Sequence, residues 1–324
     1  PAFWPLTWIF EVLPLFFFVG GFANYTSYTR PRLTGPQAGF HERRLRRLLQ
    51  PTLVFLAVWV GIEVVLNLLG AGGDGPIRSM RIGYITPFES LWFLGVYLVV
   101  VVLSPATIRL HRRFGAAVPA VLFAAVAVVD AVANVTGVPN VQLANIPLVW
   151  LLPHQLGYFY ADGRLARESP RRLLAVAAAA LVVTALLTSL PFYGRNLIDS
   201  KVAILGISAP TVPFAVMCIG VVAGALAARP ALNRWLALPR LHGLVGRLNS
   251  VVMTVFLWHM TAFFGILWLL YGLGLPMPAR PDAEWWWERP LYVILPAVAL
   301  VPLVWLFARF ERSRPAERPA AGPA

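Results

Sequence analysis

The chain has 324 residues, of which 59% are hydrophobic and 13% charged, and its mean hydropathy is +0.71. A water-soluble fold would lack enough polar side chains to cover its surface, so this composition excludes a soluble globular protein and indicates one embedded in a bilayer. The net charge of +13 would suggest a nucleic-acid partner in a soluble protein, but here its distribution matters more than its sum, and we expect no nucleic acid.

Nine apolar runs are long enough to cross a hydrocarbon core of roughly 30 Å as helices of about 20 residues each. They predict an all-α, polytopic membrane helix bundle. The runs lie near residues 4–26, 48–70, 90–108, 116–135, 144–161, 173–190, 211–228, 250–271 and 290–310. We expect one transmembrane domain over residues 1–311, followed by a disordered, Pro/Ala-rich tail over residues 312–324.

The basic residues predict the orientation of these helices. One set of loops and the tail hold 21 arginines, whereas the opposite loops hold six basic residues. The richer set comprises residues 28–47, 109–114, 162–172, 229–247 and the tail after residue 308. The positive-inside rule places this set, and the C-terminus, in the cytoplasm. Pro1 then lies outside, so we expect at least one further apolar helix upstream of it.

The first apolar run carries a carboxylate, Glu11, and a glycine pair, Gly20 and Gly21. A carboxylate at membrane depth is costly and tends to face a cavity or a partner. The glycines permit close approach of another helix, which is the better interpretation of the pair. Asn24 follows them, and its amide suits either an interhelical hydrogen bond or a contact with substrate.

The next feature is "FHERRLRRLL", residues 40–49, which we expect to be helical. At 100° per residue, Arg43, Arg46 and Arg47 fall within an arc of about 100°. With Arg44, these guanidinium groups can hold the phosphates of a nucleotide-bearing ligand. Arginines at a membrane interface are also a common topology signal and bind anionic lipid headgroups, so both interpretations stay open.

Three ionisable side chains fall inside later runs: Asp130, His154 and His259. Intramembrane ionisable residues are functional candidates, although a histidine can simply hydrogen-bond between helices. Asp130 lies near the predicted outer end of its helix, where water can solvate it. A hydroxyl or amine acceptor needs a general base, and His154 and His259 are the candidates for that role within this chain.

Motifs of soluble enzymes are missing from the sequence. It contains no Walker A sequence, no GxSxG, no HExxH and no paired CxxC, which argues against an ATPase or a zinc peptidase. We expect no metal. Broken helices and intramembrane charges also suit a transporter or flippase for a lipid or polar metabolite, or a membrane scaffold without catalysis.

Four segments in order resemble acyltransferase family 3, the bacterial integral-membrane acyltransferases. They are "LPLFFFVGGFANY" (13–25), "ERRLRRLLQP" (42–51), "SLWFLGVYLVVVVLSP" (90–105) and "VFLWHMTAF" (255–263). The ten helices of that family agree with nine runs plus one upstream helix. The first helix of the family normally carries an essential histidine, which we therefore expect on the helix upstream of Pro1.

The resemblance implies a multi-pass enzyme of the bacterial inner membrane. It would move an acyl group, expected to be acetyl, from cytoplasmic acyl-CoA to a hydroxyl of an extracytoplasmic glycan, lipid or related metabolite. The CoA phosphates would lie near Arg43 and Arg46, with Arg44 and Arg47. The path of the acyl group would be lined by Glu11, Asn24, His154 and His259.

Overall fold

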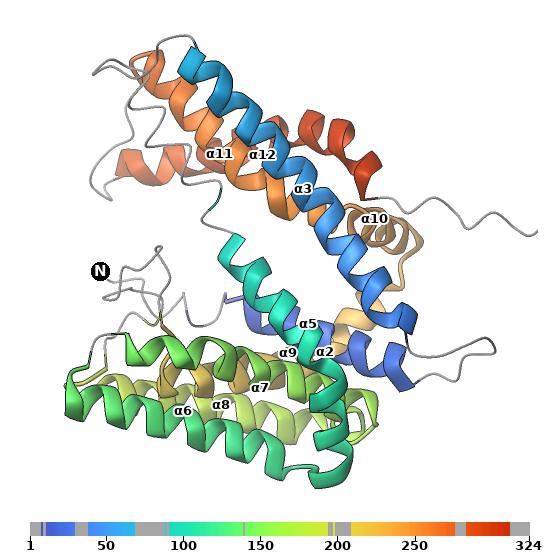
Figure 1. Ribbon diagram of the computed structural model, residues 1–324, viewed down its shortest axis with the longest axis vertical. Helices are drawn as coiled ribbons and strands as arrows, with labels where there is room; N and C mark the ends of the chain where they lie inside the picture. The colour runs from blue at the N-terminus through green and yellow to red at the C-terminus, as the bar shows by residue number, and fades with distance from the viewer. Residues whose placement is uncertain are drawn as a thin grey trace, which may run out of the picture. The chain divides into compact units, whose positions relative to one another are not determined.

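The computed structural model describes most of the chain (Figure 1). The described residues are Trp8, 11–29, 38–68, Phe88, 91–138, 140–193, Leu197, 209–275 and 283–311. Every regular element in these ranges is a helix, which confirms the all-α prediction. The chain divides into two compact units, and each is described by itself below. Unit 1 comprises Pro1–Glu42 and Trp92–Leu238, and unit 2 comprises Arg43–Leu91 and Pro239–Ala324.

The helices follow the expected runs closely. Unit 1 contains α2 (Leu13–Thr29), α5 (Leu91–Phe114, from its second residue), α6 (Ala117–Thr136), η1 (Val141–Ala144), α7 (Asn145–Ala161), η2 (Leu165–Arg167), α8 (Pro170–Thr188) and α9 (Val212–Leu236). Unit 2 contains most of α3 (Ala38–Leu68), then α10 (Pro239–Asn249), α11 (Val252–Gly272), α12 (Ala283–Phe307) and η3 (Ala308–Phe310).

Seven helices in the described ranges are long and apolar enough to cross a membrane, so the chain is a multi-pass membrane protein. They are Leu45–Val65, Leu91–Phe114, Ala117–Thr136, Pro170–Thr188, Val212–Leu236, Val252–Gly272 and Trp286–Phe310. The other two expected runs form α2 and α7, which have 17 residues each and are shorter than a typical span. The count of nine spans stays a prediction, as does the single domain over residues 1–311. The tail lies outside the described residues.

Glycine brings α2 and α7 into backbone contact in unit 1. A Cβ atom on Gly21 would overlap the carbonyl group of His154, and one on Gly157 would overlap the carbonyl oxygen of Phe18. Only glycine fits at either position, as in other close helix pairs within membranes. The interpretation of the glycine pair as packing residues is therefore confirmed for Gly21.

Aromatic rings join α5 to this helix pair. The ring of Phe17 stacks on Trp150 of α7 at 4.7 Å between centroids, and Phe16 meets Phe93 of α5 edge to face at 4.8 Å. Next to them, a Cβ atom on Gly20 would lie 2.8 Å from the Tyr97 ring. Offset and edge-on contacts of this kind add to the stability that burial provides. Together they hold α2, α5 and α7 in fixed register.

Asp130 is a buried hub that connects α6, α7 and α9. Its carboxylate accepts hydrogen bonds from Asn145 Nδ2 at 2.7 Å, Tyr193 Oη at 3.1 Å and the backbone N–H of Val212 at 2.8 Å. The expectation that water solvates Asp130 was wrong, because 2% of the residue is exposed. Burial, and then the adjacent carboxylate, raises the pKa of Tyr193 to about 12, so the phenol stays a donor at neutral pH.

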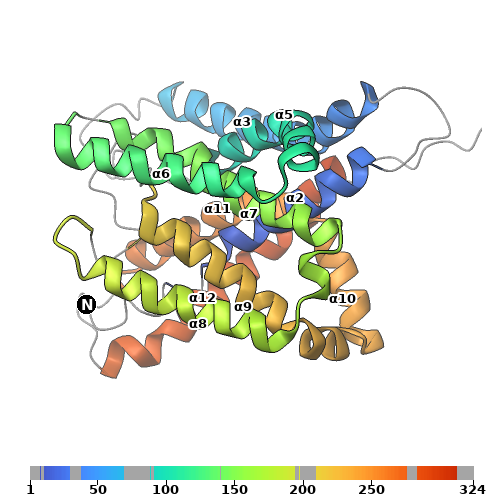
Figure 2. The same ribbon diagram turned by 90° about the horizontal axis from the view of Figure 1, so that it is seen from below.

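The helices α8 and α9 run side by side through small residues (Figure 2). A Cβ atom on Gly220 would lie 2.8 Å from the Cβ of Ala180, and Ala177 is also buried in this contact. Ser169 caps α8, since its Oγ accepts the Arg172 N–H at 3.3 Å, and Pro170 occupies the first turn. The cap explains why α8 begins where it does.

In unit 2, α3, α11 and α12 share one apolar core. Phe55 of α3 packs on Leu257 and Trp258 of α11, and Trp258 stacks on Phe307 at 4.0 Å between ring centroids. This packing fixes how the arginine-bearing helix meets the helix that carries His259.

In unit 2, the buried carboxylate of Glu311 caps the N-terminus of α11. Glu311 follows η3, and its carboxylate accepts the backbone N–H groups of Met253 at 3.1 Å and Thr254 at 2.8 Å, as well as the Thr254 hydroxyl at 2.8 Å. These N–H groups belong to the first turn of α11, where no intrahelical acceptor exists. Glu311 therefore supplies the N-terminal cap of α11 from the far end of the unit.

Helix α10 lies where the sequence predicted a loop at residues 229–247. Its apolar side chains recur at helical spacing, at Leu241, Leu244, Val245 and Leu248, and all are at least partly exposed. Basic residues interrupt this run, so a hydropathy average over a full span does not detect it.

We predict that Gly157→Ala destabilises the protein by about 1–3 kcal/mol, because the added methyl group forces α2 and α7 apart. Thermal unfolding of the purified protein in detergent measures the effect. Gly95→Ala is the matched control, since nothing lies within 4 Å of its Cβ position. The control should leave the melting temperature unchanged or slightly higher. Equal melting of both variants would contradict the close contact.

We also predict that Asp130→Ala costs about 3–5 kcal/mol of stability, because it leaves one buried and two partly buried donors without this acceptor. Asp130→Asn keeps one side-chain oxygen and should lose less. Thermal unfolding in detergent again gives the readout. If the Asp130 carboxylate were solvated and dispensable, both variants would have the melting temperature of the wild-type protein.

Candidate functional site

The fully buried side chains of Asn24, Ser104 and His154 meet at the centre of unit 1. They come from α2, α5 and α7, the three helices that the glycine contact and the aromatic rings hold together. Asn24 Nδ2 lies 3.0 Å from Ser104 Oγ and 3.1 Å from His154 Nε2. The structure thus brings two of the predicted site residues, Asn24 and His154, into direct contact.

The hydrogen-bond donors in this cluster determine which nitrogen of His154 carries the proton. The two hydrogens of the Asn24 amide nitrogen go to Ser104 Oγ and His154 Nε2, and the Ser104 hydroxyl donates to the carbonyl of Val100 at 2.9 Å. His154 Nε2 is then an acceptor, and the imidazole carries its proton on Nδ1. Asn24 therefore makes the interhelical hydrogen bond that was one of its two expected roles.

Two amide oxygens in this buried region have no hydrogen-bond partner among the described residues. They are Asn24 Oδ1 and Gln155 Oε1, both on fully buried side chains. Buried acceptors are nearly always satisfied in native proteins, by protein, water or ligand. The second expected role of Asn24, a contact with substrate, therefore stays open at its oxygen atom.

The sequence interpretation missed the polar residues that extend this cluster along α5 and α7. Thr107 Oγ1 and Tyr158 Oη share a hydrogen bond of 2.9 Å, and Gln155 Nε2 donates to the Thr107 carbonyl at 3.5 Å. The spacing of the polar residues along α5 could have revealed this cluster from the sequence. Ser104, Thr107 and His111 recur every three or four residues within an otherwise apolar helix, which marks one polar face.

The polar face ends in a small cavity where α5 and α7 terminate. The cavity has a volume of about 230 Å³ and is lined by Tyr25, His111, Arg112, Asp162 and Arg164. His111 Nε2 lies 3.0 Å from Asp162 Oδ2, and Arg164 Nε lies 3.4 Å from the same oxygen. Cationic side chains suit the partial negative charge at helix C-termini, so this cluster stabilises the helix ends.

Glu11, the remaining site candidate in unit 1, lies just before α2. Its Oε1 accepts the backbone N–H of Leu13 at 3.3 Å, and the residue is partly buried. A carboxylate in this position satisfies one of the N–H groups at the start of the helix. Glu11 therefore has a structural partner, and its expected catalytic role stays a prediction.

In unit 2, a short hydrogen bond sets the tautomer of His259. Its Nδ1 lies 2.6 Å from the carbonyl oxygen of Phe256, one turn earlier in α11. A carbonyl can only accept, so Nδ1 carries a proton, and in the neutral form of the ring the lone pair lies on Nε2. His259 is also partly exposed, unlike His154. This is the form of imidazole that a general base requires.

The arginines lie on α3, which is helical throughout residues 38–68, so the helix predicted over residues 40–49 is confirmed. Arg46 and Arg47 are exposed. Arg47 Nη2 donates to the carbonyl of Asn249, the last residue of α10, at 3.4 Å. The side chains of Arg43 and Arg44 lie outside the described part of the structure.

In the described part of the chain, no three His, Cys, Asp or Glu side chains gather closely enough to hold a metal ion. No curated protein and no solved structure matches the chain. A family model described as an acyltransferase domain matches residues 2–309, nearly the whole of the described bundle. The chain therefore belongs to acyltransferase family 3, and it is a multi-pass membrane acyltransferase.

Proposed function

We propose that the protein transfers an acyl group, acetyl in the simplest case, from cytoplasmic acyl-CoA to a hydroxyl of an extracytoplasmic glycan, lipid or related metabolite. It would act in the bacterial inner membrane with its C-terminus in the cytoplasm, in agreement with the arginine-rich loops. Family membership supports the acyl transfer itself, and favours it over the transporter or flippase expected as the alternative.

The observation that carries the proposal is the contact of Arg47 with Asn249 in unit 2. It places the arginine-bearing turn of α3 beside the chain that leads into α11, which begins at Val252. His259 lies seven residues further along α11, about 10 Å at 1.5 Å per residue. A long, thin donor with phosphates at one end and a thioester at the other suits that separation.

In the proposed reaction, His259 Nε2 removes the proton from the acceptor hydroxyl as its oxygen attacks the thioester carbonyl carbon. A carbon–oxygen bond forms, the carbon–sulfur bond breaks, and the CoA sulfur leaves as a thiolate. The imidazolium then returns the proton to that sulfur, so one acyl ester and one CoA thiol result. The Phe256 carbonyl stabilises the protonated imidazole through Nδ1.

The cluster of Asn24, Ser104 and His154 in unit 1 has a role separate from the proton transfer by His259. Asn24 Oδ1 is a buried acceptor without a partner in the described structure, and it can accept a hydrogen bond from a hydroxyl-bearing substrate or from water. His154 fixes the orientation of that amide by accepting from Nδ2. We therefore assign His154 a positioning role and Asn24 the contact with a polar substrate group.

We predict that His259→Ala lowers kcat for acyl transfer about 10²–10⁴-fold, the usual contribution of a general base. The binding of acyl-CoA should be unchanged. Release of CoA thiol by the purified full gene product, in the presence of a hydroxyl acceptor, gives the rate. His242→Ala, at an exposed histidine of α10, is the control and should retain activity. Wild-type turnover by correctly folded His259→Ala protein would contradict the proposed role of His259 as general base.

We predict that Arg43→Ala combined with Arg46→Ala raises the Kd for acyl-CoA at least about tenfold, because charge-assisted bonds to phosphate are lost. Titration of the purified protein with acetyl-CoA measures the change. Arg113→Ala combined with Arg234→Ala removes the same charge from exposed positions outside the proposed site. Equal weakening by both pairs would show only general electrostatic attraction.

A further inference from the structure

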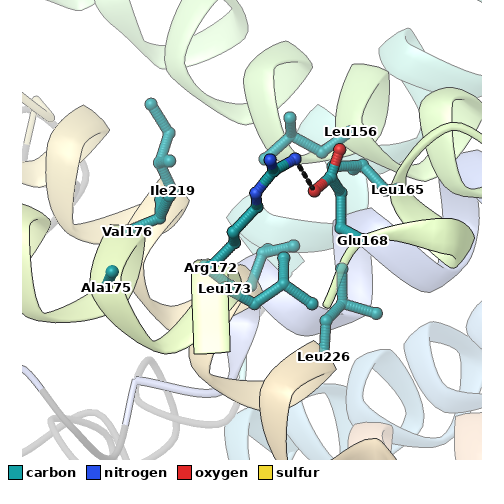
Figure 3. Close-up of a pocket in the computed structure, with 11 residues that line it drawn as sticks. Leu156, Leu165, Glu168, Arg172, Leu173, Ala175, Val176, Ile219 and Leu226 are labelled. Atoms are coloured by element: carbon teal, nitrogen blue, oxygen red, sulfur yellow. Dashed lines mark ion pairs between the residues drawn. The ribbon is translucent and has the colours of Figure 1, made fainter. Parts of the chain in front are cut away.

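A second cavity in unit 1 has none of the predicted site residues in its lining (Figure 3). Its volume is about 470 Å³, within the range of cavities that hold small-molecule ligands. Its walls are almost entirely apolar. They include Leu156 of α7, Leu165 of η2, Leu173 and Val176 of α8, and Val222 and Leu226 of α9.

One wall of this cavity belongs to a packed core. Leu173, Val222 and Leu226 are buried and pack with Phe18 of α2 into one core cluster. The cavity is therefore a recess beside a packed core. An apolar recess of this kind suits a hydrocarbon chain.

Two charged residues, Glu168 and Arg172, are part of the lining of the recess. The guanidinium group of Arg172 extends towards Glu168, and the ion pair measures 3.5 Å (Figure 3). The side chains are 80% and 39% exposed respectively, so the pair is weak and opens at little cost. Both lie at the N-terminus of α8, where the partial positive charge of the helix dipole favours a bound anion.

The depth of the recess in the bilayer follows from its helices. Pro170–Thr188 is a candidate membrane span, and Leu174 and Val182 on its outer side are 63% and 59% exposed, as lipid-facing residues are. Arg172 and Glu168 lie at the end of this span, at the level of lipid headgroups. The polarity of the recess thus varies with depth as it does in one bilayer leaflet. Its charged groups lie at headgroup level, and its apolar walls lie at the level of the acyl chains.

We propose that this recess binds a phospholipid with a primary-amine headgroup. One acyl chain occupies the apolar cavity, the phosphate binds the Arg172 guanidinium group beside the start of α8, and the ammonium group donates to the Glu168 carboxylate. Each charge of the zwitterionic headgroup then meets its opposite in the ion pair that it replaces. A choline headgroup has no N–H to donate, and a glycerol headgroup has no cation for Glu168.

The test uses the full chain in detergent, incubated with equal amounts of phosphatidylethanolamine, phosphatidylcholine and phosphatidylglycerol of identical acyl chains. Native mass spectrometry counts the lipids retained. The wild-type protein should retain the ethanolamine lipid about fivefold more than the choline lipid, as expected for one charge-assisted hydrogen bond. Glu168→Gln should abolish this preference, and Arg172→Ala should lower retention of all three lipids.

Arg171→Ala is the matched control, because Arg171 is equally close to the start of α8 but does not line the recess. It should leave retention unchanged. Ala223→Phe fills the recess and should lower retention while the melting temperature shows that the protein remains folded. Equal retention of the three lipids by the wild-type protein would overturn the proposal, as would equal effects of Arg171→Ala and Arg172→Ala. Displacement of the lipid by a long-chain acyl-CoA would assign the recess to the donor chain and would also overturn it.

Discussion

The contact of α2 with α7 at Gly21 and Gly157 determines the rest of unit 1, because it brings two backbones closer than any side chain allows. At that separation Asn24 reaches His154 across the helix pair, and Phe17 stacks on Trp150. The same approach brings polar side chains of the two helices within hydrogen-bonding distance, as the contact of Asn24 Nδ2 with His154 Nε2 shows. The buried cluster is therefore a consequence of the glycines as much as of the polar residues themselves.

Carboxylates in both units serve one shared purpose at the starts of helices. Glu11 accepts an N–H of α2, Asp130 accepts the first N–H of α9, and Glu311 accepts two N–H groups of α11. Within a bilayer, unpaired backbone groups at a helix end are costly, and an anion there also gains from the helix dipole. Glu11, Asp130 and Glu311 thus each have a structural partner at the start of a helix.

The sequence predicted the all-α fold, the positions of the helices and the helical arginine segment, since each depends on local hydropathy and helix propensity. It did not predict that Asp130 is buried, because its three donors come from residues 15, 63 and 82 positions away. The same limit applies to Ser104 and Tyr158, whose partners lie on other helices. Helix α10 was missed for a different reason, since its apolar face is too short and too often interrupted by arginine to stand out in a span-length average.

The cap that Glu311 provides to α11 has a consequence for biosynthesis. During translation, the first turn of α11 enters the membrane before Glu311 has been made, 57 positions later than Thr254. Until then Met253 and Thr254 carry exposed backbone donors at the start of a hydrophobic helix. A chain that stops short of Glu311 keeps those donors, and so presents to the cellular quality-control machinery a defect that the finished protein lacks.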